Sequence, residues 1–361
     1  MIYNKQELIN IKLQNYILNL KELLNREVCL KSKPLSAQIL LTNKCNLKCL
    51  VCNFKEYHDG TIIDGAKIEA ILKDNPQLIT VEWSGGGEPL IHPQFEYFLD
   101  LTHSLHIKQI LITNGLLLTE SIMEKIAKYD VNLVLSVDGH SKNIYEKLRV
   151  NANYDILVKN IETINKYRRK YNSKGFLRIY YIVVKENYKY LHDMLNFIEK
   201  NGINEIFFKS DCSYSDLDIV SHGTIEMKKE LQIILKEVLA YADKKAINCM
   251  IDEGMRHILF LNDEQINNKK DEKDNGFCLI PWQQVRILPK GDVVGTYFCA
   301  TPVGNIKFDS LADLWNSDIM IELRTKILNF DDTLCNHLCS EKNSIARTHS
   351  AMERFLHTLL I

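Results

Sequence analysis

The chain has 361 residues, of which 46% are hydrophobic and 25% are charged, and its formal net charge at pH 7 is −1. These proportions are typical of a globular protein with a sizeable core, and the balanced charge argues against nucleic acid or an anionic membrane as the partner. The sequence contains neither a secretion signal nor an apolar run near the roughly 20 residues that span a bilayer, so we expect a cytoplasmic protein.

Residues 5–27 have the spacing of an amphipathic helix, and Pro34 ends the region before the first strand. The apolar positions alternate by four and three residues: Ile9, Leu13, Tyr16, Leu20 and Leu23. We expect this N-terminal segment, residues 1–34, to pack on the outside of the domain that follows. The alternative is a helix that binds a partner.

Short β-branched runs then alternate with helical stretches over residues 35–215, which is typical of βα units around a parallel sheet. The predicted strands are 37–42, 78–84, 108–113, 131–137, 176–184 and 203–209. The predicted helices lie near 64–74, 94–105, 118–128, 155–171 and 188–201. Six repeats predict an α/β fold, a partial (β/α)6 TIM-like barrel, whose chemistry lies at the carboxyl ends of the strands.

Three cysteines, Cys45, Cys49 and Cys52, follow the first predicted strand at C-x3-C-x2-C spacing. Zinc sites and ordinary ferredoxin sites usually have four protein ligands, so three thiolates leave one iron of a cubane without a protein ligand. The spacing, with C-N-L-K-C inside it, resembles the radical S-adenosylmethionine (SAM) superfamily. The resemblance implies a 4Fe-4S cluster whose open iron is chelated by the amino and carboxyl groups of SAM. A zinc knuckle is the alternative.

The second predicted strand ends in Gly85, Gly86, Gly87 and Glu88, followed by proline. Successive glycines allow close approach of the backbone to a ligand, although a tight turn is the usual explanation of such a run. Placed after the strand that follows the cysteines, the stretch resembles the family's G-G-E-P motif. The resemblance implies that it holds the amino group of SAM.

Polar residues also follow the third and fourth predicted strands: Asn114, Ser136, Asp138 and, further on, Arg149. Asn114 could cap the next helix, and Ser136 or Asp138 could be turn residues. The family resemblance implies SAM contacts, with Ser136 near the ribose and Arg149 paired with the carboxylate, which suits a bidentate guanidinium. Val51 stands where relatives often have an aromatic residue against adenine, so packing there must be aliphatic or come from elsewhere.

Cys212 lies just after the sixth predicted strand, so we expect it at the barrel mouth. A lone cysteine is most often a small buried hydrophobic residue. Several enzymes of the family place at this position a thiol that gives a hydrogen atom to a substrate radical. In that role Cys212 would make the protein an epimerase.

Residues 216–275 are predicted to form a helical connection, over 222–262, and a charged linker. A last domain at 276–340 contains a predicted hairpin, 284–289 with 293–297, and four cysteines, Cys278, Cys299, Cys335 and Cys339. All-thiolate sites of this kind hold zinc or a 4Fe-4S cluster. The C-x-x-P-W opening and the later G-N-I and L-W-N-S runs resemble the SPASM domain or its shorter twitch form, which implies an auxiliary 4Fe-4S cluster. Residues 341–361 are predicted to form a final helix.

The resemblance implies an enzyme that receives an electron from a reductase such as flavodoxin or ferredoxin and cleaves SAM to a 5′-deoxyadenosyl radical. The radical would take hydrogen from a peptide or a small polyol or sugar, and the auxiliary cluster would assist dehydrogenation or cross-linking. The short N-terminal segment slightly disfavours a leader-dependent peptide as the substrate. A non-catalytic iron–sulfur or zinc sensor or scaffold is the alternative of another class.

Overall fold

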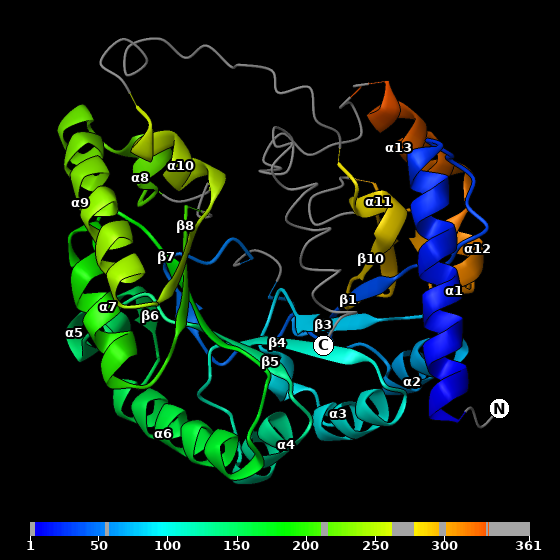
Figure 1. Ribbon diagram of the computed structural model, residues 1–361, viewed down its shortest axis with the longest axis horizontal. Coiled ribbons are helices and arrows are strands. Elements are labelled where there is room, and N and C mark those ends of the chain that lie inside the picture. The colour runs from blue at the N-terminus through cyan, green and yellow to red at the C-terminus, as the bar shows by residue number, and fades with distance from the viewer. Residues whose placement is uncertain are drawn as a thin grey trace. The chain divides into compact units, whose positions relative to one another are not determined.

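The computed structural model describes residues 4–54, 58–210, 216–261, 278–295, 301–329 and 331 (Figure 1). The chain divides into two compact units, each formed by segments that are distant in the sequence. The first unit comprises residues 1–44, 59–110 and 272–361, and the second comprises 45–58 and 111–271. Within the described residues, no helix combines the length and the apolar character needed to cross a membrane.

The first unit contains both ends of the described chain. Its elements are α1 (Lys5–Leu24), β1 (Ser36–Leu40), α2 (Gly65–Asp74), β3 (Thr80–Ser84), the 3-10 helix η2 (Pro89–Ile91), α3 (Phe95–Ser104), α11 (Ile280–Gln283), β10 (Gln284–Ile287), β11 (Asp292–Val294), β12 (Gly304–Asn305), α12 (Leu311–Trp315) and α13 (Asp318–Leu328). The strands of this unit follow the order β12-β11-β10-β1-β3. Strand β4 (Lys108–Thr113) crosses the boundary between the units.

The predicted C-terminal hairpin is confirmed, because β10 and β11 pair antiparallel. Its attachment was not predicted. Strand β10 also pairs parallel with β1, with Ser36 opposite Gln284 and Ile39 opposite Ile287. The hairpin therefore extends the sheet that contains β1 and β3, and it is fixed beside the strand that leads to Lys44.

Helix α1 is confirmed, and its N-terminus carries a capping box between Asn4 and Glu7. The predicted apolar stripe is wrong in part, because Ile9 and Leu13 are 42% and 46% exposed. The buried face is partly polar, and Asn19 Nδ2 donates to the carbonyl of Trp282 at 2.6 Å. Helix α1 thus holds the C-terminal part of its own unit by hydrogen bonds as well as by apolar packing.

Lys12 is the buried cation on this face, and its Nζ donates to the carbonyls of Pro76, at 2.9 Å, and Leu78. Burial lowers the pKa of Lys12 to about 7 from an ordinary value of 10.5. Between these two values the unfolded chain binds a proton that the folded chain releases. The contribution of Lys12 to stability should therefore rise with pH from about 7 upward, by at most about 1.4 kcal/mol per pH unit.

The measurement is urea unfolding of wild type and Lys12→Met across the range from about pH 7 to about pH 9. We expect the stability difference between the two proteins to shift toward wild type as the pH rises. Lys21, exposed on the same helix, is the matched control, since its replacement by methionine removes no buried contact. A difference between wild type and Lys12→Met that stays constant with pH would contradict the prediction.

Arg324, in α13, joins the C-terminal helices to the N-terminal segment of the same unit. Its side chain is fully buried. The guanidinium donates to three carbonyl oxygens, those of Pro281, Val28 and Trp315, each at 2.9 Å. It also lies over the ring of Trp315, 4.4 Å from the centroid. A single side chain thus connects three segments that are far apart in the sequence.

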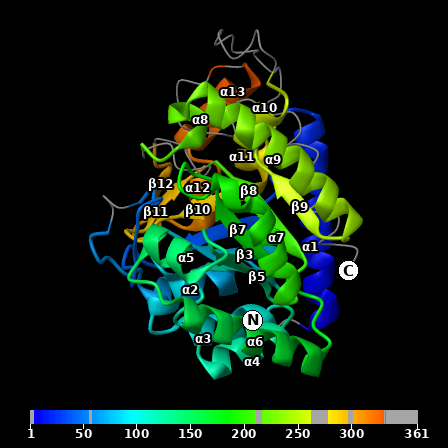
Figure 2. The same ribbon diagram turned by 90° about the vertical axis from the view of Figure 1, so that its left-hand side faces the viewer.

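The second unit forms a parallel sheet with helices packed against it (Figures 1 and 2). Its elements are β2 (Lys48–Cys49), α4 (Glu120–Lys128), β5 (Asn132–Ser136), α5 (Lys142–Leu148), β6 (Arg149–Val150), α6 (Tyr154–Tyr171), β7 (Leu177–Ile182), the 3-10 helix η3 (Tyr188–Tyr190), α7 (Leu191–Lys200), β8 (Glu205–Lys209), α8 (Ile219–His222), α9 (Ile225–Lys244), β9 (Asn248–Ile251) and α10 (Glu253–Leu259). The strand order is β5-β7-β8-β9, all parallel, while β2 and β6 form a separate antiparallel pair.

The six predicted strands are confirmed as β1, β3, β4, β5, β7 and β8. The prediction that residues 222–262 are helical throughout is wrong, because β9 interrupts them and pairs with β8. In both views α9 lies alongside α7, so the chain leaves β8, runs back along α9 and adds one more strand to the sheet. The result is an α/β fold with a mostly parallel sheet, as the partial-barrel prediction requires.

Candidate iron–sulfur and SAM site

The three cysteines of the first motif lie in the second unit, and all three are partly exposed. Each sulfur accepts a hydrogen bond from the chain, and Cys52 Sγ also has His58 Nε2 as a neighbour at 4.0 Å. The backbone N–H groups of Leu47 and Phe54 donate to Cys45 Sγ and Cys52 Sγ, each at 3.4 Å. Arg149 Nη1 donates to Cys49 Sγ at 3.8 Å. Donors directed at three sulfur atoms suit thiolate ligands, whose charge they stabilise.

The donor set itself fits an iron–sulfur cluster. Three cysteine thiols within eight residues, with hydrogen-bond donors directed at their sulfur atoms, match the thiolate ligands that a cubane takes from a protein, and they leave its fourth iron for another ligand. Cys45, Cys49 and Cys52 are therefore the residues that would hold the cluster.

A short antiparallel pair fixes the middle cysteine. Cys49, in β2, stands opposite Arg149, in β6, and the N–H of Leu50 donates to the carbonyl of Leu148 at 2.8 Å. Val51 is buried in a cluster with Leu148 and Val184. Its side chain therefore anchors the cysteine loop to the body of the second unit.

Arg149 and Asp138 form a buried ion pair, with 2.7 Å between Nη2 and Oδ2. Asp138 Oδ1 also accepts from the N–H of Ile182 at 2.8 Å, which fixes the carboxylate to the next strand. Burial raises the pKa of Asp138, and the guanidinium of Arg149 opposes that rise. Burial likewise raises the pKa of the Cys49 thiol to about 11, again opposed by Arg149. The cation thus favours the charged forms of both neighbours.

The G-G-G-E stretch follows β3 in the first unit and lies against Lys44, the residue before Cys45. The N–H of Glu88 donates to the carbonyl of Lys44 at 2.9 Å. A Cβ atom added at Gly87 would lie 2.2 Å from that same oxygen. Glu88 is buried, and its side chain accepts from the N–H of Leu90, capping η2. The contact of this stretch with the SAM amino group stays a prediction.

Asn114 contacts the cysteine loop directly. Its Nδ2 donates to Asn46 Oδ1 at 2.8 Å, and its Oδ1 accepts from the N–H of Leu116 at 3.0 Å. The alternative that Asn114 caps the following helix is wrong, because Thr119 caps α4. Ser136 is the last residue of β5 and is partly buried. SAM contacts by Asn114, Ser136, Asp138 and Arg149 stay predictions.

Asp59 was missed by the sequence analysis. Its carboxylate accepts from Asn43 Nδ2 at 3.1 Å and from the N–H of Thr61 at 3.0 Å, and it pairs with Lys290 Nζ at 2.9 Å. The N–H of Thr61, together with Lys290, holds the pKa of this carboxyl well below its usual range. The Asp-Gly-Thr sequence does indicate a turn. The distant partners, Asn43 and Lys290, have no sequence signal.

Four predicted site residues, Cys212, Cys299, Cys335 and Cys339, lie outside the described residues, as do the predicted linker and final helix. Cys278 is described, and it is partly exposed, two residues before α11. The roles of these cysteines stay predictions.

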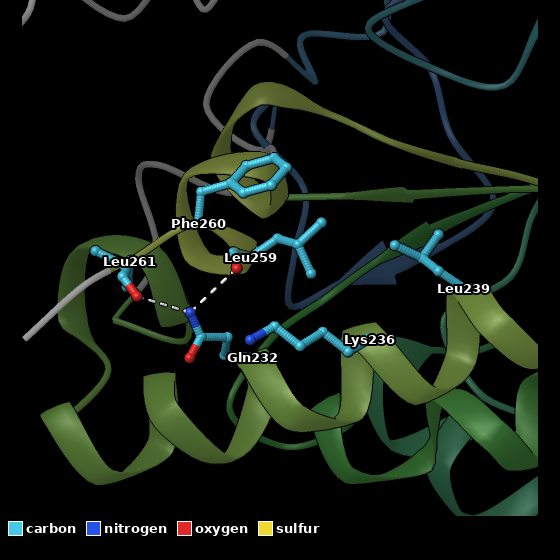
Figure 3. Close-up of a pocket in the computed structure, with 6 residues that line it drawn as sticks. All are labelled: Gln232, Lys236, Leu239, Leu259, Phe260 and Leu261. Carbon is cyan, nitrogen blue, oxygen red and sulfur yellow. Dashed lines mark hydrogen bonds between the residues drawn. The ribbon is translucent and has the colours of Figure 1, made fainter.

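A separate cavity of about 500 Å³ lies between α9 and the end of α10 (Figure 3). It is lined by Gln232, Lys236, Leu239, Leu259, Phe260 and Leu261. Gln232 Nε2 donates to the carbonyls of Leu259 and Leu261 at one side of it. None of the predicted site residues lines this cavity, so it is not part of the candidate site.

Comparison with known families finds two domains. Residues 39–198 match the radical SAM superfamily, and residues 278–341 match the SPASM iron-sulfur cluster-binding domain.

Similar curated proteins include the tungsten-containing aldehyde ferredoxin oxidoreductase cofactor-modifying protein of Pyrococcus furiosus, which is 25% identical over 77% of this chain and 80% of its own length. The antilisterial bacteriocin subtilosin biosynthesis protein AlbA of Bacillus subtilis is 23% identical, over 80% of this chain and 61% of its own. The radical SAM cyclopropyl synthase TigE of Paramaledivibacter caminithermalis is 24% identical, over 81% of this chain and 62% of its own length. The alignments thus span less than two thirds of AlbA and of TigE.

Among solved structures, Streptococcus suis SuiB bound to precursor peptide SuiA has a TM-score of 0.64 and 21% identity, covering 87% of this chain and 71% of that one. The anSMEcpe structure with bound AdoMet and Cp18Cys peptide has a TM-score of 0.59 and 18% identity, covering 91% of this chain and 97% of that one. At these identities the likeness concerns the fold.

Proposed function

The chain belongs to the radical SAM superfamily and carries a C-terminal SPASM domain, and from this we propose that it removes a hydrogen atom from a peptide substrate and oxidises it. Its cofactors are 4Fe-4S clusters and SAM. When bound, these groups supply one-electron chemistry that the side chains of a protein cannot perform. The hydrogen-bond donors directed at all three sulfur atoms are the observation that carries the proposal.

The residues of this chain would bind and orient these groups. Cys45, Cys49 and Cys52 would hold the first cluster. Asn114 would fix the loop between Cys45 and Cys49 through its hydrogen bond to Asn46. Gly85–Glu88 would receive the amino group of SAM, and Ser136 its ribose. Cys278 with Cys299, Cys335 and Cys339 would hold the auxiliary cluster. An electron carrier such as flavodoxin or ferredoxin would reduce the enzyme.

A peptide is favoured over a small polyol or sugar by the names of the relatives. AlbA is a bacteriocin biosynthesis protein, mycofactocin maturases are also similar, and SuiB was solved with a precursor peptide. The proposal therefore departs from the expectation, drawn from the short N-terminal segment, that the substrate is not a leader-dependent peptide. The match to the auxiliary iron–sulfur domain supports oxidation, either dehydrogenation or cross-linking. Epimerisation with Cys212 as the hydrogen donor is the alternative.

The first test is reductive cleavage of SAM by anaerobically reconstituted protein, measured as 5′-deoxyadenosine by chromatography. We expect wild type to form it, and Cys49→Ala to lose at least about 100-fold in rate, because a ligand substitution removes the cluster. Cys249→Ala is the matched control, since Cys249 is another partly buried free cysteine in the same unit. It should retain the activity. Protein that binds iron and sulfide but forms no 5′-deoxyadenosine would favour the sensor or scaffold alternative.

The second test concerns the reaction. Short peptides encoded beside the gene are incubated with the enzyme in deuterated buffer and analysed by mass spectrometry. A product lighter by two hydrogens supports oxidation. A product of unchanged composition that carries one deuterium supports epimerisation and contradicts the oxidation proposal.

A further inference from the structure

Arg149 contacts the candidate cluster site through a sulfur atom. Its Nη1 lies 3.8 Å from Cys49 Sγ and its Nη2 lies 2.7 Å from Asp138 Oδ2. The residue is only 7% exposed. A guanidinium stays charged under all ordinary conditions, so a permanent positive charge lies beside one of the three sulfur atoms.

Three features of the second unit hold Arg149 in this place. The pairing of β2 with β6 puts Cys49 and Arg149 opposite each other. The carboxylate of Asp138 orients the guanidinium, and Asp138 is itself fixed by the N–H of Ile182. Because backbone pairing and a buried ion pair act together, the contact with sulfur follows from the fold and needs no bound ligand.

We propose that Arg149, oriented by Asp138, is a positioning residue that donates to the Cys49 thiolate and raises the reduction potential of the first cluster. This assignment rests on the proposed function, because it requires a cluster on Cys45, Cys49 and Cys52. It replaces the role expected for Arg149 from the sequence, pairing with the carboxylate of SAM.

The sign of the effect follows from electrostatics. Reduction adds negative charge to the cluster, and donors to its sulfur ligands stabilise that charge. The carboxylate of Asp138 offsets part of the cation's influence, since it lies against the same guanidinium. Removing the cation should therefore lower the potential, whereas removing the neighbouring anion should raise it.

The geometry disfavours the carboxylate of SAM as the partner. A bidentate pair between a guanidinium and a carboxylate uses two parallel N–H donors. In Arg149 both terminal nitrogens already have partners, Asp138 and Cys49, and Nε has none among the described residues, so a bidentate pair would have to share a terminal nitrogen with one of these partners. A second carboxylate would displace one of them or add a second negative charge to a buried site, which is costly.

The experiment is a redox titration of the reconstituted full chain without SAM, followed by electron paramagnetic resonance. The first cluster is identified as the signal that changes when SAM is then added. Arg149→Gln should shift the oxidised-to-reduced ratio about tenfold toward the oxidised form at fixed potential, equal to a fall of about 59 mV. Asp138→Asn keeps an acceptor for Ile182 and should shift the ratio several-fold in the opposite direction.

Two controls separate this effect from general damage. Arg178→Gln breaks another ion pair of the same unit, with Glu205 at 2.6 Å, and should leave the potential unchanged. Tyr145→Phe removes a buried hydroxyl that has no hydrogen-bond partner, and it should also leave the potential unchanged. Damage to the fold would shift the reduction potential in the same direction in Arg149→Gln and Asp138→Asn, whereas the proposal requires shifts of opposite sign.

The outcomes are distinct. Opposite shifts in the two variants, with a SAM dissociation constant changed by less than about threefold in Arg149→Gln, support the proposal. An unchanged potential with SAM affinity lost overturns it and assigns the guanidinium to SAM, although the proposed function would stand if wild type cleaves SAM. Wild-type protein that takes up no cluster on the three cysteines overturns both.

Discussion

Replacement of Gly87 by alanine should reduce the rate of SAM cleavage by at least about 100-fold. The added Cβ would lie 2.2 Å from the carbonyl oxygen of Lys44 and 2.7 Å from its carbon. These are backbone atoms, so no side chain can rotate away to make room. The strand end and the residue before Cys45 must separate, and the hydrogen bond from Glu88 to Lys44 should break. A small displacement at a site that orients reacting groups is enough for a loss of this size.

Gly85→Ala is the matched control in the same stretch. Its Cβ would lie 3.4 Å from the nearest atom, Leu40 Cβ, which is a close but ordinary contact. We expect it to lose much less of the rate than Gly87→Ala, because the added methyl group displaces no backbone atom. Both variants are compared by 5′-deoxyadenosine formation, iron content and thermal unfolding. Equal losses in the two variants would show that the stretch is sensitive to any side chain, and the steric argument for Gly87 would then be wrong.

Arg324→Met should lower the free energy of unfolding by about 3–5 kcal/mol, the cost expected when a buried charged group with several partners is removed. The carbonyl oxygens of Pro281, Val28 and Trp315 would lose their donor in a buried setting. The chain segment that begins just after Cys278 would lose one of its links to the N-terminal segment. The quantity is measured by urea unfolding of wild type and variant.

Lys326→Met is the control for Arg324→Met, because Lys326 lies two residues further along α13 and forms a partly exposed ion pair with Glu322. It should change the stability by no more than about 0.5 kcal/mol. If Arg324→Met proves as mild as this control, the buried hydrogen bonds of Arg324 contribute little, and the other contacts between these segments, such as the pairing of β10 with β1, hold them together.

The regular part of the fold could be predicted because its elements bury side chains in a simple period. Strand β7 alternates buried and partly exposed residues from Leu177 to Ile182, and β4 was predicted with its observed bounds. Strand β9 was missed because its four residues, Asn248–Ile251, are all at least partly exposed at the edge of the sheet and follow a long helix. Apolar periodicity cannot reveal a strand that is held mainly by backbone pairing with β8.

The candidate site could be predicted only where its chemical groups come from residues that are close together in the sequence. The three cysteines and the glycine stretch have diagnostic spacing. The pairing of Arg149 with Asp138 and Cys49 has none, since it depends on β2 and β6 meeting across about 100 residues of chain. The same is true of Asp59, whose partners Asn43 and Lys290 come from separate segments. Such contacts follow from topology, which local sequence does not contain.

The parallel pairing of β10 with β1 has a consequence for the synthesis of the chain. Ser36 finds its partner Gln284 only after about 250 further residues have left the ribosome. Until then one side of β1 has unpaired N–H and C=O groups, the kind of open edge that recruits other chains. Closing so long a loop also slows folding, because its entropy must be lost before the contacts form. The strand leading to the first cysteine motif therefore gains its second neighbour only after β10 has been synthesised.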